Sequence, residues 1–241
     1  MKIKCVSLIN SANREVFVER FKGLDYEFFD AIDGRLTQDN FSHEKFFYKY
    51  NRIARPGEIG CSLSHYFLFK SLIYSDNDSL IILEDDAKPE LSLTQLCSDL
   101  ERFNTESPTI IILGHSKTIK NNLFIQRLKQ PLKDKIEIGK CIFGKNRRIS
   151  RVGTVAYYIN KPAANILASM KEIYWLADEW SLISSFGINV YHPIDPVIYE
   201  DLDSVSSTGN SVHINHNIYD RFFLQLAAII KSQILYFLGK I

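Results

Sequence analysis

Three consecutive carboxylates directly follow a short apolar run in the first half of the sequence. The run is Leu80–Leu83, and Glu84, Asp85 and Asp86 come after it. In open α/β sheets, ligands bind just beyond the carboxyl ends of the strands, where these acids are expected. Side chains alternate along an extended chain, which predicts Glu84 and Asp86 on one side and Asp85 on the other. Two oxygen ligands on one side suit Mg²⁺ or Mn²⁺, although an acidic triplet is also compatible with a solvated turn or a helix N-cap.

A second segment, Arg55–Tyr66, combines two glycines with groups that bind metals or act as nucleophiles. Gly57 and Gly60 permit a close backbone approach at the start of a helix, where exposed N–H groups favour a phosphate. Cys61 and His65 lie one helical turn apart, which is compatible with a nucleophile pair or with half of a metal site. A packed cysteine beside a hydrogen-bonded histidine is the simpler interpretation.

Two later segments carry further candidates. Gly153 stands inside an expected strand, Val152–Ile159, and indicates a backbone that passes near a ligand. Asp178 lies between Trp175 and Trp180, the only two tryptophans of the chain. Tryptophan faces suit the apolar faces of sugar rings, and a nearby carboxylate can accept a hydroxyl proton. Asp178 also stands where it could cap a helix, and the two roles are compatible.

The rest of the pattern predicts the framework that positions these residues. Short apolar runs alternate with longer amphipathic ones, which is typical of a mainly parallel central sheet flanked by helices. The expected strands are Ile3–Ile9, Tyr26–Ala31, Leu80–Leu83, Thr109–Leu113 and Val152–Ile159. The expected helices are Arg14–Lys22, Glu58–Tyr74, Ser92–Phe103, Pro162–Met170 and Asp178–Ser185. Between residues 122 and 149 the pattern loosens, which we interpret as a β excursion or as acceptor-side loops.

The last stretch differs from the rest, so we divide the chain into a domain of residues 1–216 and a tail of residues 217–241. Apolar residues recur in the tail with helical spacing and form one broad face, which predicts an amphipathic helix. Its basic residues, Arg221, Lys231 and Lys240, could contact anionic lipid headgroups at the inner face of the cytoplasmic membrane. Docking of the same face on the domain, or on a second subunit, explains the pattern equally well.

Composition excludes several classes of protein. A net charge of only +1 provides no field that would attract nucleic acid, so we expect no nucleic-acid partner. No stretch is long and uncharged enough to span a bilayer, and Met1–Ile9 predicts a first strand rather than a signal peptide. The cysteines are scattered and include no CxxC pair, which suits neither a zinc site nor a disulfide framework and predicts reduced thiols in a cytoplasmic protein. They are Cys5, Cys61, Cys97 and Cys141.

Taken in order, these segments resemble the bacterial lipooligosaccharide glycosyltransferases of glycosyltransferase family 25, relatives of the collagen galactosyltransferases. The matching pieces span residues 6 to 180, and their order and spacing argue against chance convergence. They are Val6–Ile9 with Arg14, Phe29–Gly34, Gly57–Cys61 with Ser64 and His65, Leu83–Asp86, Gly153 and Thr154 with Ala156 and Tyr157, and Asp178.

The resemblance implies a GT-A-like fold, a UDP-sugar donor, inversion at the anomeric carbon and a divalent cation, Mn²⁺ or Mg²⁺. It implies a saccharide or glycolipid acceptor of the lipooligosaccharide or lipopolysaccharide type, with galactose the favoured hexose. Carried over to this chain, Glu84 and Asp86 are the expected metal ligands and Asp178 the expected general base. The residues expected on the nucleotide-sugar side are Arg14, Ser64, His65 and Asp85.

Two other classes of protein remain open at this point. A metal-dependent nucleotidyltransferase or phosphohydrolase would also use clustered acids, but it needs a second acidic cluster or a phosphate loop, and the sequence offers neither. A non-catalytic carbohydrate-binding scaffold would keep the fold, although the intact acids argue against it. If a third metal ligand comes from the protein, we expect one of His192, His213 or His216 rather than His65. The next candidates for the base are Asp195, Asp201 and Asp203.

Overall fold

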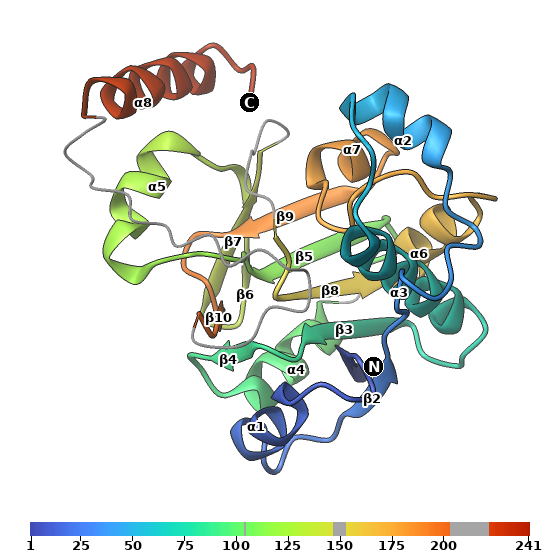
Figure 1. Cartoon of the computed structure of the whole chain (residues 1–241). Helices are drawn as coiled ribbons and strands as arrows, with labels where there is room; N and C mark the ends of the chain where they lie inside the picture. Colours follow the sequence, from blue (N-terminus) through green and yellow to red (C-terminus); the bar gives the residue numbers. More distant parts are fainter. Residues whose placement is uncertain (104, 147–152, 203–221) are drawn as a thin grey trace.

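The central element of the computed structural model is a mixed eight-stranded sheet with the strand order β2-β1-β3-β8-β5-β9-β7-β6 (Figure 1). The structure describes residues 1–103, 105–146, 153–202 and 222–241. Only β8 and β7 run against their neighbours, so six of the eight strands point the same way. The strands are β1 Lys2–Ser7, β2 Glu27–Asp30, β3 Ser79–Glu84, β5 Thr109–Gly114, β6 Lys133–Ile138, β7 Cys141–Lys145, β8 Ala156–Asn160 and β9 Asn189–Pro193.

A second, two-stranded sheet lies close to the carboxyl end of β3. It pairs β4 (Ala87–Pro89) with β10 (Ile198–Glu200) in antiparallel register, so that Glu200 lies opposite Ala87. Because β4 follows β3 after only two residues, this pairing brings a segment from late in the chain to the acidic triplet.

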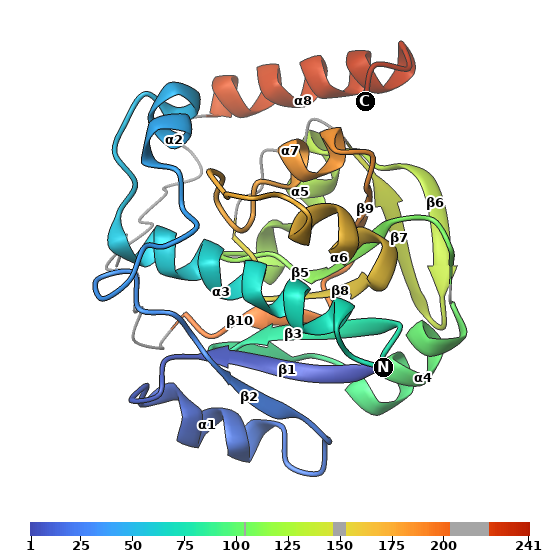
Figure 2. The same ribbon diagram turned by 90° about the vertical axis from the view of Figure 1, so that its right-hand side faces the viewer.

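Helices cover both faces of the large sheet (Figure 2). The side chains of β3 divide between two apolar cores: Leu80 and Ile82 pack on one face, and Ile81 and Leu83 on the other. The first core is closed mainly by α2, α3, α6 and α7, and the second by α1 and α4. The helices are α1 Asn13–Arg20, α2 His43–Tyr50, α3 Pro56–Ile73, α4 Leu93–Arg102, α5 Leu123–Lys129, α6 Lys161–Ala168, α7 Trp180–Ser185 and α8 Phe222–Phe237.

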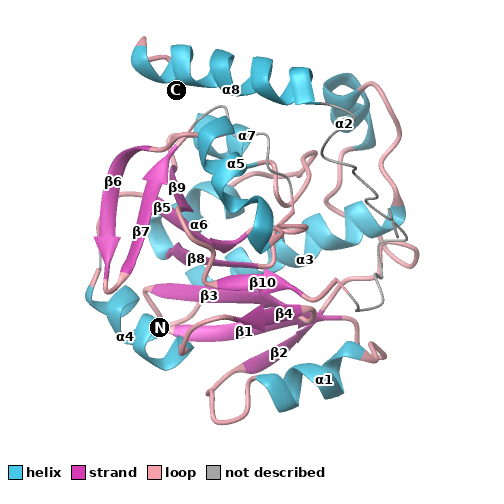
Figure 3. Ribbon diagram, turned by 90° about the vertical axis from the view of Figure 1, so that its left-hand side faces the viewer, coloured by secondary structure: helices cyan, strands magenta, loops and turns pink. Residues whose placement is uncertain are grey.

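The mainly parallel sheet flanked by helices, and a helix in the tail, are therefore confirmed. Each expected strand and helix is present, with ends that differ by up to four residues. The segment between residues 122 and 149 contains α5 and a hairpin of β6 and β7, which forms one edge of the sheet (Figure 3). Four further elements, α2, β4, β9 and β10, were not predicted from the sequence, because each is short and pairs or packs with distant residues.

Two glycines make close contacts within the chain. A Cβ at Gly60 would lie 2.4 Å from the carbonyl oxygen of Ile32, so the backbone at Gly60 packs tightly against that residue. Gly153 precedes β8 instead of lying inside a strand, and it adopts a φ of +98°. A Cβ there would lie 2.1 Å from that of Ser116.

Helix α8 lies against α5 with one side and leaves the other side open (Figure 1). Gln233 Nε2 donates a hydrogen bond to the carbonyl of Leu128 at 2.7 Å, and Lys133 Nζ lies 5.0 Å from the ring centre of Tyr236. On the open side Ile230 and Ile234 are 51% and 52% exposed. Among the described residues, no helix is both long and apolar enough to cross a membrane.

Candidate active site

Asp85 faces the loop that follows β1. Its Oδ2 accepts hydrogen bonds from Ser7 Oγ and Ser11 Oγ, both at 2.6 Å, and its Oδ1 accepts one from Asn13 Nδ2 at 3.3 Å. These bonds tie the end of β3 to the start of α1.

Arg14 belongs to the same network. Its Nη2 donates to the carbonyl of Ser7 at 2.9 Å and to Asp30 Oδ1 at 2.5 Å, and its guanidinium stacks over Phe28. Arg14 is partly exposed at the carboxyl ends of β1 and β2, so it is available to a ligand at this edge. Contact with a nucleotide stays a prediction.

Glu84 points instead toward α3. Its Oε1 lies 3.8 Å from His65 Nε2, and the Sγ of Cys61 lies near both. The His65 Nδ1 is hydrogen-bonded to the hydroxyl of Tyr157 at 2.6 Å. Burial lowers the pKa of His65 to about 4, so its ring is neutral at physiological pH. Burial raises the pKa of Glu84 well above its usual value, and the nearby charge of Asp178 adds to the shift.

Asp86 is the most strongly perturbed aspartate that the structure describes. Burial raises its pKa to about 9, and the charges of Glu84, Glu200 and Asp85 contribute in that order. Its Oδ1 is buried and has no hydrogen-bond partner among the described residues. A buried carboxylate with an unpaired oxygen, surrounded by other acids, lacks the positive charge that would make its ionised form stable.

Glu200 is an acid of this cluster that the sequence analysis missed. The pairing of β10 with β4 carries it to the acidic triplet, and its Oε2 accepts a hydrogen bond from the Lys117 N–H at 2.5 Å. The sequence does hold a signal, because the apolar run Val197–Tyr199 ends in Glu200 and Asp201 just as Leu80–Leu83 ends in the triplet.

Asp178 approaches the cluster from the segment before α7. Its Oδ2 accepts a hydrogen bond from the N–H of Gly153, which holds the two segments together. Burial raises its pKa, and the hydrogen bond from Gly153 lowers it in part. Its charge also acts on His65 and Glu84. Asp178 does not cap α7, because the helix begins after Glu179.

A divalent cation fits this site by its chemistry. The orphaned Asp86 Oδ1 and the raised pKa values of Glu84 and Asp86 show an excess of negative charge that a cation would offset. The candidate ligands are carboxylate oxygens, which Mg²⁺ and Mn²⁺ prefer. Glu84 and Asp86 are the residues that would hold the ion.

Ser64 and the two tryptophans, which were expected to contact substrate, are buried in the core. Ser64 is completely buried, donates to the carbonyl of Gly60 at 2.7 Å and accepts from the Ile32 N–H at 2.8 Å, so the structure gives it a packing role. Trp175 and Trp180 are 3% and 2% exposed and present no face to a sugar, which corrects that interpretation. Both fill the core beneath Asp178 because indole rings bury a large apolar area.

Of the histidines expected to complete a metal site, only His192 is among the described residues, and it packs against another histidine. His192 is buried and stacks on His115, with Nδ1 3.2 Å from the Nε2 of its neighbour. His213 and His216 lie outside the described residues, as does Asp203. Two of the alternative bases form ion pairs: Asp195 with Arg127, and Asp201 with Arg20.

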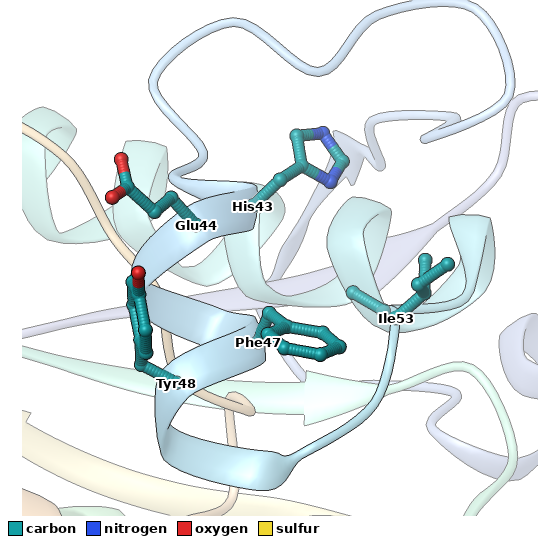
Figure 4. Close-up of a pocket in the computed structure, with 6 residues that line it drawn as sticks. His43, Glu44, Phe47, Tyr48 and Ile53 are labelled. Atoms are coloured by element: carbon teal, nitrogen blue, oxygen red, sulfur yellow. The ribbon is translucent and has the colours of Figure 1, made fainter.

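A separate pocket of about 340 Å³ lies on the outer side of α2. Figure 4 shows the ring of Phe47 pointing toward Ile53 across it, with His43 at one side. None of its six lining residues is among the predicted site residues. The opposite side of α2 does reach the site region, since the Tyr50 hydroxyl donates to Glu179 at 2.7 Å, next to Asp178.

The chain belongs to glycosyltransferase family 25. The profile of that family, described as "Glycosyltransferase family 25 (LPS biosynthesis protein)", matches residues 1–180. A "Glycosyltransferase 25 family member" of Aedes aegypti is 28% identical over a match of 146 residues, and the match covers 47% of this chain and 24% of the relative. One of Anopheles gambiae is 34% identical over a match of 76 residues, and this match covers 28% of this chain and 13% of the relative. The matches thus cover a quarter or less of these relatives' length.

Among solved structures, this chain is similar to the galactosyltransferase LgtC in complex with donor and acceptor sugar analogues. The match covers 79% of this chain and 73% of the LgtC chain. The identity is 14% and the TM-score is 0.34. The family assignment rests on the sequence match, because a TM-score and an identity this low do not support an assignment.

Proposed function

We propose that the protein is a metal-assisted, inverting glycosyltransferase that moves a hexose, with galactose favoured, from a UDP-sugar to a saccharide of the lipooligosaccharide or lipopolysaccharide type. The observation that carries the proposal is the half-buried cluster of Glu84, Asp86 and Glu200 beside Asp178, in a chain of glycosyltransferase family 25. An unpaired carboxylate oxygen in that cluster favours a bound cation, and a bound cation would offset the charge of a diphosphate donor.

On the donor side, Glu84 and Asp86 would hold Mn²⁺ or Mg²⁺. When bound, the ion offsets the negative charge that develops on the departing UDP. Asp85 fixes the loop after β1 through Ser7 and Ser11, and this loop leads into Arg14 on the nucleotide side. His65 supports the same region through its contact with Tyr157.

On the acceptor side, Asp178 would accept the proton of the sugar hydroxyl as that oxygen attacks the anomeric carbon. Burial raises the pKa of Asp178, which makes it a stronger base than a solvated aspartate. Attack on the face opposite the departing UDP inverts the anomeric centre without a covalent intermediate. Positioning of the two sugars contributes the rest of the rate.

A screen of nucleotide products tests this proposal. The protein is mixed with UDP-galactose, UDP-glucose or UDP-N-acetylglucosamine, with and without Mn²⁺, and with and without a saccharide acceptor. We expect UDP as the product and a release rate that rises with acceptor and metal. UMP with sugar phosphate would indicate a phosphohydrolase, for which Glu200 supplies a further acid. No product under any condition would favour a carbohydrate-binding scaffold.

We also propose that α8 holds the enzyme reversibly on the inner face of the cytoplasmic membrane. Its open side presents Leu226, Ile230 and Ile234, and its other side docks on α5, so the apolar surface is not covered by the domain. The segment 222–241 contains no acidic residue and includes Lys231 and Lys240, which suits anionic headgroups at about 1 kcal/mol each. Two basic residues predict moderate rather than tight binding.

Liposome co-sedimentation checks this expectation. Full-length protein should sediment with anionic vesicles more than with neutral ones, and the double variant Ile230→Ser with Ile234→Ser should lose most of that binding. The matched control changes two exposed apolar residues elsewhere, Leu36→Ser with Tyr74→Ser, and should bind like the wild type. Equal sedimentation of all three proteins would contradict membrane contact and favour an interface with a second subunit.

A further inference from the structure

Three different metal-binding groups meet between α3 and the end of β3. Cys61 and His65 lie one turn apart on α3, and Glu84 is the last residue of β3. The Cys61 Sγ, a His65 ring nitrogen and a Glu84 carboxylate oxygen all lie within 4.8 Å of one another. We infer that Cys61, His65 and Glu84 form a binding site for a thiophilic divalent cation such as Zn²⁺.

The state of His65 supports this inference independently. Its side chain is almost completely buried, and its Nε2 has no hydrogen-bond partner among the described residues. The Glu84 Oε1 lies 3.8 Å away, which is too far for a hydrogen bond. The other ring nitrogen, Nδ1, is 2.6 Å from the Tyr157 hydroxyl. In metal-binding histidines, the ring nitrogen that does not bind the metal is characteristically hydrogen-bonded to a neighbour. That bond orients the ring so that the lone pair of the other nitrogen points at the metal.

The ligand set identifies the class of ion. A thiolate is a soft ligand and selects Zn²⁺ over Mg²⁺, whereas carboxylates alone do not. Ligand atoms around tetrahedral Zn²⁺ stand roughly 3.3 to 3.8 Å apart, given bonds of about 2.0 to 2.3 Å. The spacing within the trio requires shifts of only about 1 Å to meet this geometry. Three protein ligands leave a fourth position for water, and the partial exposure of Cys61 and Glu84 gives the ion access.

This site was not predictable from cysteine spacing, which lacks a CxxC pair. Its third ligand comes from a strand that only the tertiary structure places beside α3. Asp86 is not one of these three ligands, so the donor-side metal site of Glu84 and Asp86, which offers only oxygen ligands, is a separate site. Glu84 belongs to both sites. A thiophilic ion bound here would therefore withdraw one carboxylate from the donor site.

Cobalt spectroscopy on the full-length protein tests the inference without any activity measurement. Co²⁺ replaces Zn²⁺ in tetrahedral sites, and a cobalt–thiolate bond produces a charge-transfer band in the near ultraviolet. We expect this band on titration with Co²⁺, and we expect excess Zn²⁺ to abolish it. Cys61→Ser should remove the band, whereas the matched control Cys97→Ser on α4, and Asp86→Asn, should both retain it.

Two outcomes overturn the inference: no charge-transfer band in the wild type, or a band that persists in Cys61→Ser. Circular dichroism and thermal melting show whether Cys61→Ser is folded. If it is not, Glu84→Gln replaces it, since that side chain is partly exposed at the end of β3. Unchanged Co²⁺ affinity of the charge-transfer band in Glu84→Gln then contradicts the site, and a loss of at least about tenfold in that affinity supports it.

Discussion

Replacing Asp86 by Asn is expected to reduce sugar transfer by about 10²–10³-fold at saturating Mn²⁺, the usual effect of removing one group that stabilises charge in a transition state. Asn keeps the shape of the side chain and removes the negative charge that binds the cation. The fold should remain intact, because Asp86 Oδ1 makes no hydrogen bond to any described residue that the change would break.

In the absence of divalent cations, Asp86→Asn should be more stable than the wild type, although it is less active. The unfolded chain ionises Asp86 near its ordinary pKa of 3.8, whereas the folded chain retains the proton up to about pH 9. Between these values the unfolded state binds fewer protons, so Asp86 makes the wild type less stable as the pH rises. The variant lacks this penalty. Its melting temperature should exceed that of the wild type at about pH 8, and the difference should shrink toward about pH 4.

Turnover, Mn²⁺ affinity and melting curves measured together check both expectations. The matched control is Asp76→Asn, which removes one charge from an exposed loop residue and should leave all three unchanged. Wild-type turnover and Mn²⁺ affinity in Asp86→Asn would exclude Asp86 as a metal ligand. A lower melting temperature at high pH would show that the carboxylate is stabilised in the fold by contacts other than a cation.

The parts of this site that the sequence predicts are those encoded locally. Four apolar residues followed by three acids specify both a buried strand and its carboxyl end, and β3 ends at Glu84, one residue beyond the expected Leu83. The opposite orientation of Glu84 and Asp85 also follows from the alternation along a strand, and their contacts confirm it. The helix that carries Cys61 and His65 is also encoded by residues close together in the sequence. At its start, Glu58 accepts a hydrogen bond from the Arg55 N–H.

The parts that escaped prediction depend on pairing between distant segments. Glu200 reaches the acids only because β10 pairs with β4, more than a hundred residues earlier in the chain. The contact of His65 with Glu84 needs α3 to pack across β3 and β8, which no local pattern encodes. The role predicted for the two tryptophans was wrong for a related reason: their type suits sugar stacking, but their burial is decided by tertiary packing.

The second large effect is expected for Asp178→Asn, which should reduce the rate of the chemical step by about 10²–10⁴-fold, the usual contribution of a general base. Donor affinity should stay close to that of the wild type, because the amide removes the proton-accepting group and not the shape of the site. The substitution also separates two roles of Asp178. An Asn side-chain oxygen can still accept the hydrogen bond from the Gly153 N–H, so the segment before β8 should remain in place.

Single-turnover measurements with bound UDP-sugar, together with donor binding, provide the test. Asp178→Ala loses both the base and the acceptor for Gly153, so comparison with Asp178→Asn isolates the structural part. Equal losses of rate in the two variants are expected for a general base. Near-normal turnover in Asp178→Asn with a severe defect in Asp178→Ala would make Asp178 a loop-holding residue. Glu179→Gln is the matched control: its carboxylate contacts Tyr50 and Lys49, and its loss should affect melting more than the chemical step.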